Sequence, residues 1–225
     1  MSALLPLFLT LTGRRVLLVG AGPVAAGKLD QLLAAGADVR VVAPEVDARI
    51  ERAVAAAEAS RVDIARRAFE PADLDGAWLV VAAATPEVNR EVRRAADERR
   101  IFVNAVDDPA NATAFLSGVV RRQGVTIAVS TSGDAPALTA LLREALDDVL
   151  PEADDLREWM DEARRQRTIW RRDGVPMPDR RRLLLDALNR LHEKATAEDT
   201  ALAEKPFGYS PVSASSAAAF RAEDL

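Results

Sequence analysis

Two adjacent carboxylates, Asp107 and Asp108, follow the apolar run IFVNAV at residues 101–106. Such a short apolar run is typical of a buried strand, so the two acids would lie just beyond a strand end. A carboxylate in that place can accept or deliver a proton while a hydride leaves a substrate carbon. The alternative is a plain turn, because Asp-Asp-Pro favours turns in any protein.

A glycine-rich loop offers a second chemical feature. Gly20-x-Gly22-x-x-Ala25 stands between a strand expected at residues 15–19 and a helix expected to begin at Pro23. Gly20 permits a tight turn, Gly22 lets the backbone approach a pyrophosphate, and Ala25 allows close packing of helix and strand. The helix N-terminus then offers free N–H groups to the phosphates. The loop predicts dinucleotide binding, and the alternative is an ordinary turn with small residues.

The second expected strand, residues 38–43, should be followed by an acid that holds the adenosine ribose. Pro44 and Glu45 follow it, so the acid is present but displaced by a short distance along the chain. No Arg or Lys directly follows the strand to take a 2′-phosphate, which favours NAD over NADP. Glu45 could equally be a first-turn acid that stabilises the next helix.

Two further loops follow expected strands. The small residues around Thr85 would let a cofactor lie close to the backbone, although Thr85 could also cap a helix that starts at Pro86. The segment 130–133 precedes a helix and combines hydroxyls with a glycine, which makes a plausible anion site. Its residues Ser130, Thr131, Ser132 and Gly133 are therefore candidates for binding the substrate, and the alternative is capping by Ser132 or Asp134.

Strand-like and helix-like runs alternate through the first half of the chain, which indicates a Rossmann-like doubly wound parallel sheet of the α/β class. The expected strands are residues 15–19, 38–43, 62–67, 77–84 and 101–106, and the expected helices are 23–36, 45–58 and 86–99.

The pattern changes after residue 112. Two strand-like runs joined by Gln123-Gly124 predict a hairpin, a helix follows at about 136–149, and two charged helices flank a break at 174–178. We therefore expect an NAD-binding domain at 1–112, a small α+β region at 113–150, a helical domain at 151–195 and a flexible tail at 196–225.

Composition excludes several classes of protein. Asp and Glu number 35 against 30 Lys and Arg, giving a net charge of −5, which argues against a nucleic-acid binder. The chain has no Cys and one His, so we expect no zinc, haem or iron–sulfur site and no bound metal of its own. No apolar run approaches the roughly 20 residues that span a bilayer, and no signal peptide is recognisable, so we expect a cytoplasmic protein.

Across roughly residues 5–150 the chain resembles the precorrin-2 dehydrogenase / sirohydrochlorin ferrochelatase family, the module also found at the N-terminus of sirohaem synthase. The segments that carry the resemblance occur in the family's order and spacing. They are LPLFLTLTGRRVLLVGAGPVAAGK, GADVRVVAPE, AAATPEVN, RRIFVNAVDDP and AVSTSGDAPALTALLRE.

The resemblance implies an enzyme that oxidises precorrin-2 to sirohydrochlorin with NAD, and in some members also inserts ferrous iron. By match to the family's motifs, Asp107 is the catalytic aspartate, while Pro23, Val24, Pro44 and Glu45 contact the cofactor. The resemblance also implies a homodimer, with residues 113–147 corresponding to the family's dimerisation region. Because precorrin-2 carries several carboxylates, basic residues should bind it. The candidates are Arg14, Arg15, Lys28, Arg121, Arg122 and Arg143, of which we expect a minority to matter.

Two rival functions remain open. Another NAD-dependent oxidoreductase would usually supply a Tyr-x-x-x-Lys pair or a core histidine, but Tyr209 lies in the expected tail and His192 near the C-terminus. A module that senses NAD without catalysis would need no carboxylate beside the nicotinamide. Replacing Asp107 separates the enzyme from the sensor.

Overall fold

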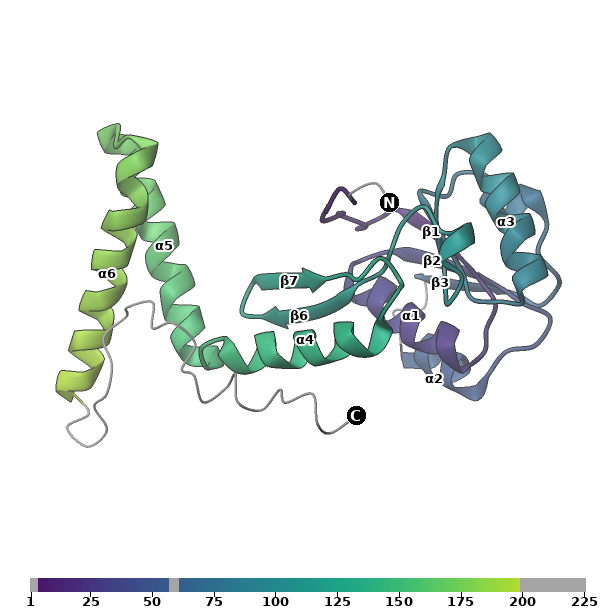
Figure 1. Cartoon of the computed structure of the whole chain (residues 1–225), viewed down its shortest axis with the longest axis horizontal. Coiled ribbons are helices and arrows are strands. Elements are labelled where there is room, and N and C mark those ends of the chain that lie inside the picture. Colours follow the sequence, from purple (N-terminus) through teal and green to yellow (C-terminus); the bar gives the residue numbers. More distant parts are fainter. Residues whose placement is uncertain (1–3, 57–60, 199–225) are drawn as a thin grey trace. The chain divides into compact units, whose positions relative to one another are not determined.

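The computed structural model describes residues 4–56 and 61–198 (Figure 1). The chain forms two compact units. The first contains the residues up to Val120 together with Ile127–Asp147, and the second contains Arg121–Thr126 and the residues from Asp148 onward. All the loops that the sequence predicts to carry chemistry belong to the first unit.

A five-stranded parallel sheet forms the centre of the first unit, with the strand order β3-β2-β1-β4-β5. This order confirms the Rossmann-like doubly wound parallel sheet. The strands are β1 (Arg15–Val19), β2 (Asp38–Val42), β3 (Val62–Ala65), β4 (Leu79–Ala82) and β5 (Phe102–Ala105).

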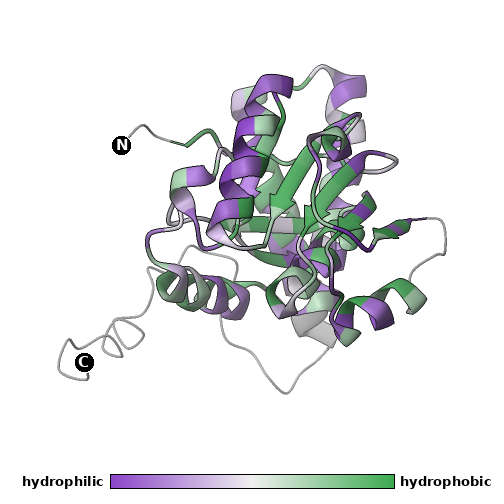
Figure 2. Cartoon of the chain, turned by 90° about the vertical axis from the view of Figure 1, so that its right-hand side faces the viewer, coloured by the Kyte–Doolittle hydropathy of each residue, from purple (hydrophilic) through white to green (hydrophobic). Residues whose placement is uncertain are grey.

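Helices cover both faces of the sheet. Successive residues of a strand point to opposite faces, so alternate residues of β1 belong to different apolar clusters. Val16 and Leu18 belong to the apolar cluster that includes residues of α1 (Pro23–Ala34) and α2 (Ala48–Ala56). The intervening residues Leu17 and Val19 belong to a second cluster, which includes residues of α3. The strands are accordingly hydrophobic throughout, between helices with polar outer faces (Figure 2). Helix α3 spans Pro86–Arg99.

The order of the strands reverses between β1 and β4. From β1 the chain proceeds outward through β2 and β3, then crosses back to form β4 on the other side of β1. The loops that follow β1 and β4 therefore lie side by side at the carboxyl edge of the sheet. In open α/β sheets this switch point is where ligands bind.

Gly20 makes the close approach of these two loops possible. It follows β1 in a left-handed conformation with φ of 97°, and a Cβ at this position would lie 2.2 Å from the carbonyl oxygen of Ala83. Its N–H donates to the carbonyl oxygen of Val42, 2.9 Å away, which ties the loop to β2 as well. Only glycine fits this junction.

Most element bounds lie within two residues of those expected, and the differences are largest for α2 and β4. Helix α2 begins at Ala48 instead of residue 45, because the Asp47 carboxylate accepts the N–H of Arg49 at 2.7 Å and so caps the helix. Strand β4 covers only Leu79–Ala82 of the expected 77–84.

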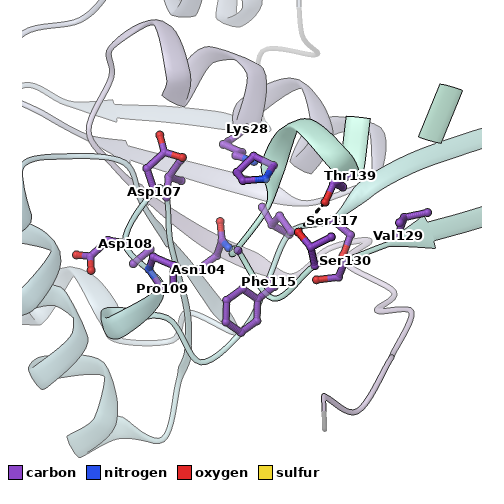
Figure 3. A pocket seen from close by; sticks show the side chains of 16 residues that line it. Lys28, Asn104, Asp107, Asp108, Pro109, Phe115, Ser117, Val129, Ser130 and Thr139 are labelled. Atoms are coloured by element: carbon purple, nitrogen blue, oxygen red, sulfur yellow. Dashed lines mark hydrogen bonds between the residues drawn. The ribbon is translucent and has the colours of Figure 1, made fainter. Parts of the chain in front are cut away.

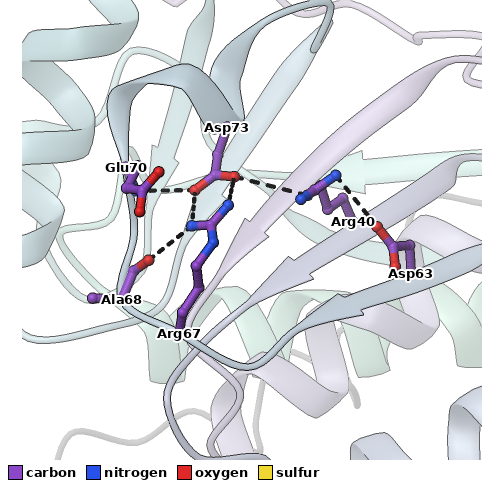
Figure 4. Close-up of polar contacts among 6 residues, drawn as sticks. All are labelled: Arg40, Asp63, Arg67, Ala68, Glu70 and Asp73. Atoms are coloured by element: carbon purple, nitrogen blue, oxygen red, sulfur yellow. Dashed lines mark hydrogen bonds and ion pairs between the residues drawn. The ribbon is translucent and has the colours of Figure 1, made fainter.

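An ion-pair cluster secures the return of the chain from β3 to β4 (Figure 4). Arg67 donates two hydrogen bonds, of 2.8 and 2.6 Å, to the carboxylate of Asp73, which lies in the short helix η1 (Pro71–Leu74). Arg40 lies between Asp73 and Asp63 at 3.8 and 3.4 Å. The hydrogen bonds from Arg67 lower the pKa of the buried Asp73, so its charge is retained within the fold.

The chain then forms the small α+β region that the sequence predicts. Strands β6 (Gly118–Arg122) and β7 (Val125–Val129) pair through a two-residue turn, in which Gln123 and Gly124 both have positive φ. Helix α4 (Pro136–Val149) packs against β6, and a Cβ on Gly118 would lie 3.0 Å from the methyl carbon of Thr139.

The second unit is centred on two helices, α5 (Ala153–Asp173) and α6 (Met177–Glu198), which confirm the helical C-terminal region. Gly174 ends α5 in a left-handed conformation. Burial alone would raise the pKa of Glu162, but hydrogen bonds from Gln166 and Arg165 lower it overall.

Of the tail expected at 196–225, residues 196–198 belong to α6 and the rest lies outside the described residues. Among the described helices, none combines the length and apolar character needed to cross a membrane.

We predict that Gly20→Ala lowers the free energy of unfolding by roughly 2–4 kcal/mol. The substitution adds left-handed strain of about 1–2 kcal/mol and forces the added Cβ against the Ala83 carbonyl. Gly27→Ala is the matched control. Gly27 lies inside α1 and a Cβ there meets nothing within 4 Å, so this variant should gain about 0.5–1 kcal/mol. Urea unfolding of both variants tests the pair, and equal effects would contradict it.

Candidate functional site

The glycine loop leaves room for a dinucleotide. Gly22 caps α1, and a Cβ on it would meet nothing within 4 Å, so space lies open over the loop. The first backbone N–H with an acceptor inside the helix is that of Ala26, which donates to Gly22. The amides of Val24 and Ala25 are therefore available to an anion, while Pro23 has no N–H. This donor set fits a pyrophosphate.

The loop after β2 lies beside the glycine loop, because the N–H of Asp47 donates to the carbonyl oxygen of Ala21 at 2.9 Å. Pro44 and Glu45 are both exposed there. Since Asp47 is committed to capping α2, Glu45 is the acid of this loop that remains for a ribose. Glu45 is not a first-turn acid of α2, because the helix begins at Ala48 and its first-turn acid is Glu51.

The loop after β4 is held by a buried asparagine. Asn89 is only 2% exposed, and its Oδ1 accepts the N–H of Ala84 at 3.2 Å. Thr85 caps α3 at its N-terminus, with its backbone oxygen accepting the N–H of Asn89. The backbone N–H of Glu87 and the Thr85 hydroxyl lower the pKa of the Glu87 carboxyl. Thr85 therefore has a local structural role and is also exposed at the edge where a cofactor would lie.

The sequence left open whether the two acids after β5 form a turn or serve in proton transfer, and the structure gives them different surroundings. The Asp108 carboxylate accepts a hydrogen bond of 2.8 Å from the Asn111 side chain and so belongs to the turn at η2 (Pro109–Asn111). Asp107 is exposed and has a left-handed backbone with φ of 55°. Among the described residues none donates a hydrogen bond to its carboxylate, and a strained residue of this kind often marks a functional position.

Asp107 lines a pocket together with three of the four residues predicted to bind substrate, namely Ser130, Thr131 and Gly133 (Figure 3). Ser132 does not line it. The loop that contains Gly133 packs closely against the loop after β5. A Cβ on Gly133 would lie 3.0 Å from a ring carbon of Pro109. The pocket encloses about 180 Å³. The other lining residues include Lys28, Asn104, Phe115, Leu116, Ser117 and Thr139.

The hydroxyl next to the start of α4 belongs to Thr131, whereas the sequence analysis considered Ser132 and Asp134 as caps of this helix. The Thr131 hydroxyl accepts the N–H of Ala135 at 3.2 Å and lies 2.9 Å from the hydroxyl of Thr139. The Thr131 hydroxyl therefore binds the N–H of the residue just before α4, and among the described residues neither the Ser132 nor the Asp134 side chain makes a hydrogen bond to a helix N–H. Ser132 instead donates its N–H to the Ser130 hydroxyl and adopts a left-handed conformation with φ of 59°.

Asn104 is a site residue to which the sequence analysis gave no role. It lies in β5, is 6% exposed, and donates its amide N–H to the carbonyl oxygen of Ala114 at 3.0 Å. This contact fixes the orientation of the amide, because a carbonyl can only accept. The opposite atom, Oδ1, is buried at the pocket and has no partner among the described residues. The sequence signal that could have identified Asn104 is a polar residue inside the apolar run at residues 101–106.

Lys28 reaches the same pocket from α1 (Figure 3). Burial lowers the pKa of its ammonium group, and the nearby charge of Asp107 offsets part of this effect. The sequence placed Lys28 among six basic candidates and could not rank them, since their exposure depends on the fold. Among the described residues, no group of three or more His, Cys, Asp or Glu side chains is arranged to hold a metal ion.

The sheet order, the open glycine loop and the pocket beside it define a dinucleotide-binding protein with a Rossmann-like fold. Residues 7–118 match the family described as "Putative NAD(P)-binding", and residues 122–148 match "Sirohaem biosynthesis protein central". The two matches together cover more than half of this chain. Its cofactor class is a nicotinamide dinucleotide.

Curated relatives carry the name siroheme synthase. "Siroheme synthase 1" of Aeromonas salmonicida is 42% identical over 149 residues, which is 66% of this chain and 31% of the relative. "Siroheme synthase" of Photorhabdus laumondii is 41% identical over 150 residues, again 66% of this chain and 31% of the relative. The chain thus spans about a third of the length of the curated relatives that it matches.

A solved structure shares the fold. "SirC, precorrin-2 dehydrogenase" has a TM-score of 0.64 to this chain at 22% sequence identity, covering 87% of this chain and 98% of the other. At this level of identity the likeness shows the fold alone.

We predict that Ser132→Gly raises the free energy of unfolding by about 0.5–1 kcal/mol. Glycine relieves left-handed strain of about 1–2 kcal/mol and adds an entropic cost of about 0.5–1 kcal/mol. Ser132→Ala, which removes the hydroxyl and keeps the strain, should leave stability nearly unchanged. Thermal unfolding of both variants is the measurement. A larger loss for glycine than for alanine would show that the Ser132 side chain makes a stabilising contact.

Proposed function

We propose that this chain oxidises precorrin-2 to sirohydrochlorin with NAD, as a step of sirohaem biosynthesis. The observation that carries the proposal is the Asp107 carboxylate. It lines a pocket at the carboxyl edge of the sheet, near an open glycine loop, and no described residue donates a hydrogen bond to it. The match of residues 122–148 to the family described as "Sirohaem biosynthesis protein central" supports this substrate class.

The reaction removes two hydrogens from the substrate, one as a hydride and one as a proton. NAD, when bound, accepts the hydride. The Asp107 carboxylate accepts the proton, which requires it to be ionised and free of internal hydrogen bonds. Asn104 lines the same pocket and borders the macrocycle beside Asp107.

The residues of three loops would hold the cofactor. The loop at Gly20 and Gly22 provides the close approach, and the amides after Pro23, including that of Val24, bind the pyrophosphate. Pro44 and Glu45 border the adenosine ribose, and Thr85 borders the crevice from the β4 side. The substrate would lie against the loop at residues 130–133. Ser130, Thr131 and Gly133 line the pocket, and Ser132 shapes the loop between them.

Glu45 favours NAD over NADP. Its exposed carboxylate can accept hydrogen bonds from both ribose hydroxyls, and it would repel a 2′-phosphate. The charged neighbour Asp47 is committed to its helix cap and cannot substitute for Glu45.

A homodimer through residues 113–147 is also part of the proposal. Helix α4 has no buried residue in the single chain, and Leu138, Leu141 and Leu142 expose a continuous apolar stripe. A second copy of the chain would cover this stripe. The use of ferrous iron as a second substrate and the cytoplasmic location stay predictions.

Asp107→Asn tests the catalytic assignment. Asparagine has the same shape and tolerates the left-handed backbone, so the variant should fold and bind NAD normally. Because the amide cannot accept the proton, turnover of precorrin-2 should fall by about 10²- to 10⁴-fold. Anaerobic NADH formation and NAD titration measure the two effects.

The control for Asp107 is Asp134→Asn, which changes an exposed acid that does not line the pocket. It should retain the wild-type rate. A full rate in Asp107→Asn would refute the assignment, and a loss of NAD binding would make Asp107 a structural residue.

Glu45→Ala tests the cofactor preference. Loss of charge-assisted hydrogen bonds, worth about 1.5–3 kcal/mol, should raise the KM for NAD by roughly tenfold or more. The KM for NADP should stay the same or fall. Glu91→Ala on α3 is an exposed control that removes an equal charge and should change neither KM. An unchanged NAD-to-NADP ratio in Glu45→Ala would contradict the assignment.

A further inference from the structure

We propose that Lys28 binds a side-chain carboxylate of the tetrapyrrole and thereby selects a polycarboxylate substrate. The inference rests on the proposed function and selects, from the six basic candidates of the sequence, the one that lies in α1. Lys28 would thus contribute to substrate specificity, beside the proton transfer assigned to Asp107.

The charges at the pocket wall support this assignment. Among the described residues that line the pocket, Lys28 is the one cation, and Asp107 and Asp108 are the anions. Two carboxylates alone would repel an anionic substrate. The Lys28 ammonium offsets that repulsion and can make a charge-assisted hydrogen bond to one substrate carboxylate.

The environment of Lys28 costs stability that a ligand would recover. The side chain is half-buried and its main electrostatic partner is the charge of Asp107, with no hydrogen bond to a carboxylate among the described residues. A partly desolvated ammonium without a close counterion is unfavourable. A substrate carboxylate at the pocket would supply a close counterion for this half-buried ammonium group.

The other basic candidates do not line the pocket, and three of them have other contacts. Arg122 donates to the carbonyl oxygens of Leu150 and Pro151, and Arg143 pairs with Glu144. The Arg14 guanidinium stacks on the ring of Trp78, 3.8 Å from its centroid. None of the six candidates other than Lys28 lines the pocket.

The phosphates of the dinucleotide are the competing ligand for Lys28. They would lie at the amides of Val24 and Ala25, at the start of α1. Lys28 follows Val24 by four residues, about 6 Å along the helix axis. It shares the pocket with Asn104 and Asp107, which favours the substrate over the phosphates.

The experiment compares Lys28→Met with Lys28→Arg in the full chain. Anaerobic absorbance titration with sirohydrochlorin, the product, measures tetrapyrrole affinity without turnover, and a separate titration measures NAD affinity. Lys28→Met should bind sirohydrochlorin about 10- to 100-fold more weakly and NAD equally well. Lys28→Arg should stay within about fivefold of wild type because it keeps the charge. Arg94→Met, which removes an exposed charge on α3, should bind like wild type.

A melting temperature for Lys28→Met equal to or above that of wild type supports the proposal, because a buried charge held for binding costs stability. Wild-type affinity for sirohydrochlorin in Lys28→Met would overturn the proposal. Weakened NAD binding in that variant would reassign Lys28 to the dinucleotide phosphates. If the wild-type chain itself binds NAD and not sirohydrochlorin, the proposed function fails first, and the two failures are distinguishable.

Discussion

The contact between Gly20 and the carbonyl of Ala83 is the constraint on which the site depends. It exists because β1 and β4 are neighbours although they are far apart in the chain. Any side chain at position 20 would separate the loops that follow these strands. Their close approach, together with the hydrogen bond from Gly20 to Val42, gathers three loops at one edge of a rigid sheet.

This rigid edge holds groups that would be unfavourable elsewhere. Asp107 has a left-handed backbone, Asn104 has a buried acceptor without a partner, and Lys28 has a half-buried ammonium group. Each state costs free energy, and the apolar clusters on both faces of the sheet supply the stability that maintains it. A ligand with carboxylates would pair with the Lys28 ammonium, which is the chemistry of a tetrapyrrole with acidic side chains.

The sequence predicted the features that are local in the chain. Apolar runs located all five strands of the sheet, and Gly174 marked the end of α5. It could not predict which residues meet across the fold. Asp107 and Asp108 are chemically alike and adjacent, and both line the pocket, so only the contact of Asp108 with Asn111 distinguishes their carboxylates. Lys28 was one of six basic candidates that the sequence could not rank, and Asn104 had no assigned role, until the fold placed both at one pocket.

The central claim is that this chain couples the oxidation of precorrin-2 to the reduction of NAD. The most direct test is anaerobic turnover of the purified chain, with NADH absorbance and the sirohydrochlorin spectrum recorded together. Our account predicts one NADH for each sirohydrochlorin formed, at a rate proportional to enzyme concentration. Demonstrable NAD binding without either product would contradict it, and would favour a protein that senses the dinucleotide without catalysis.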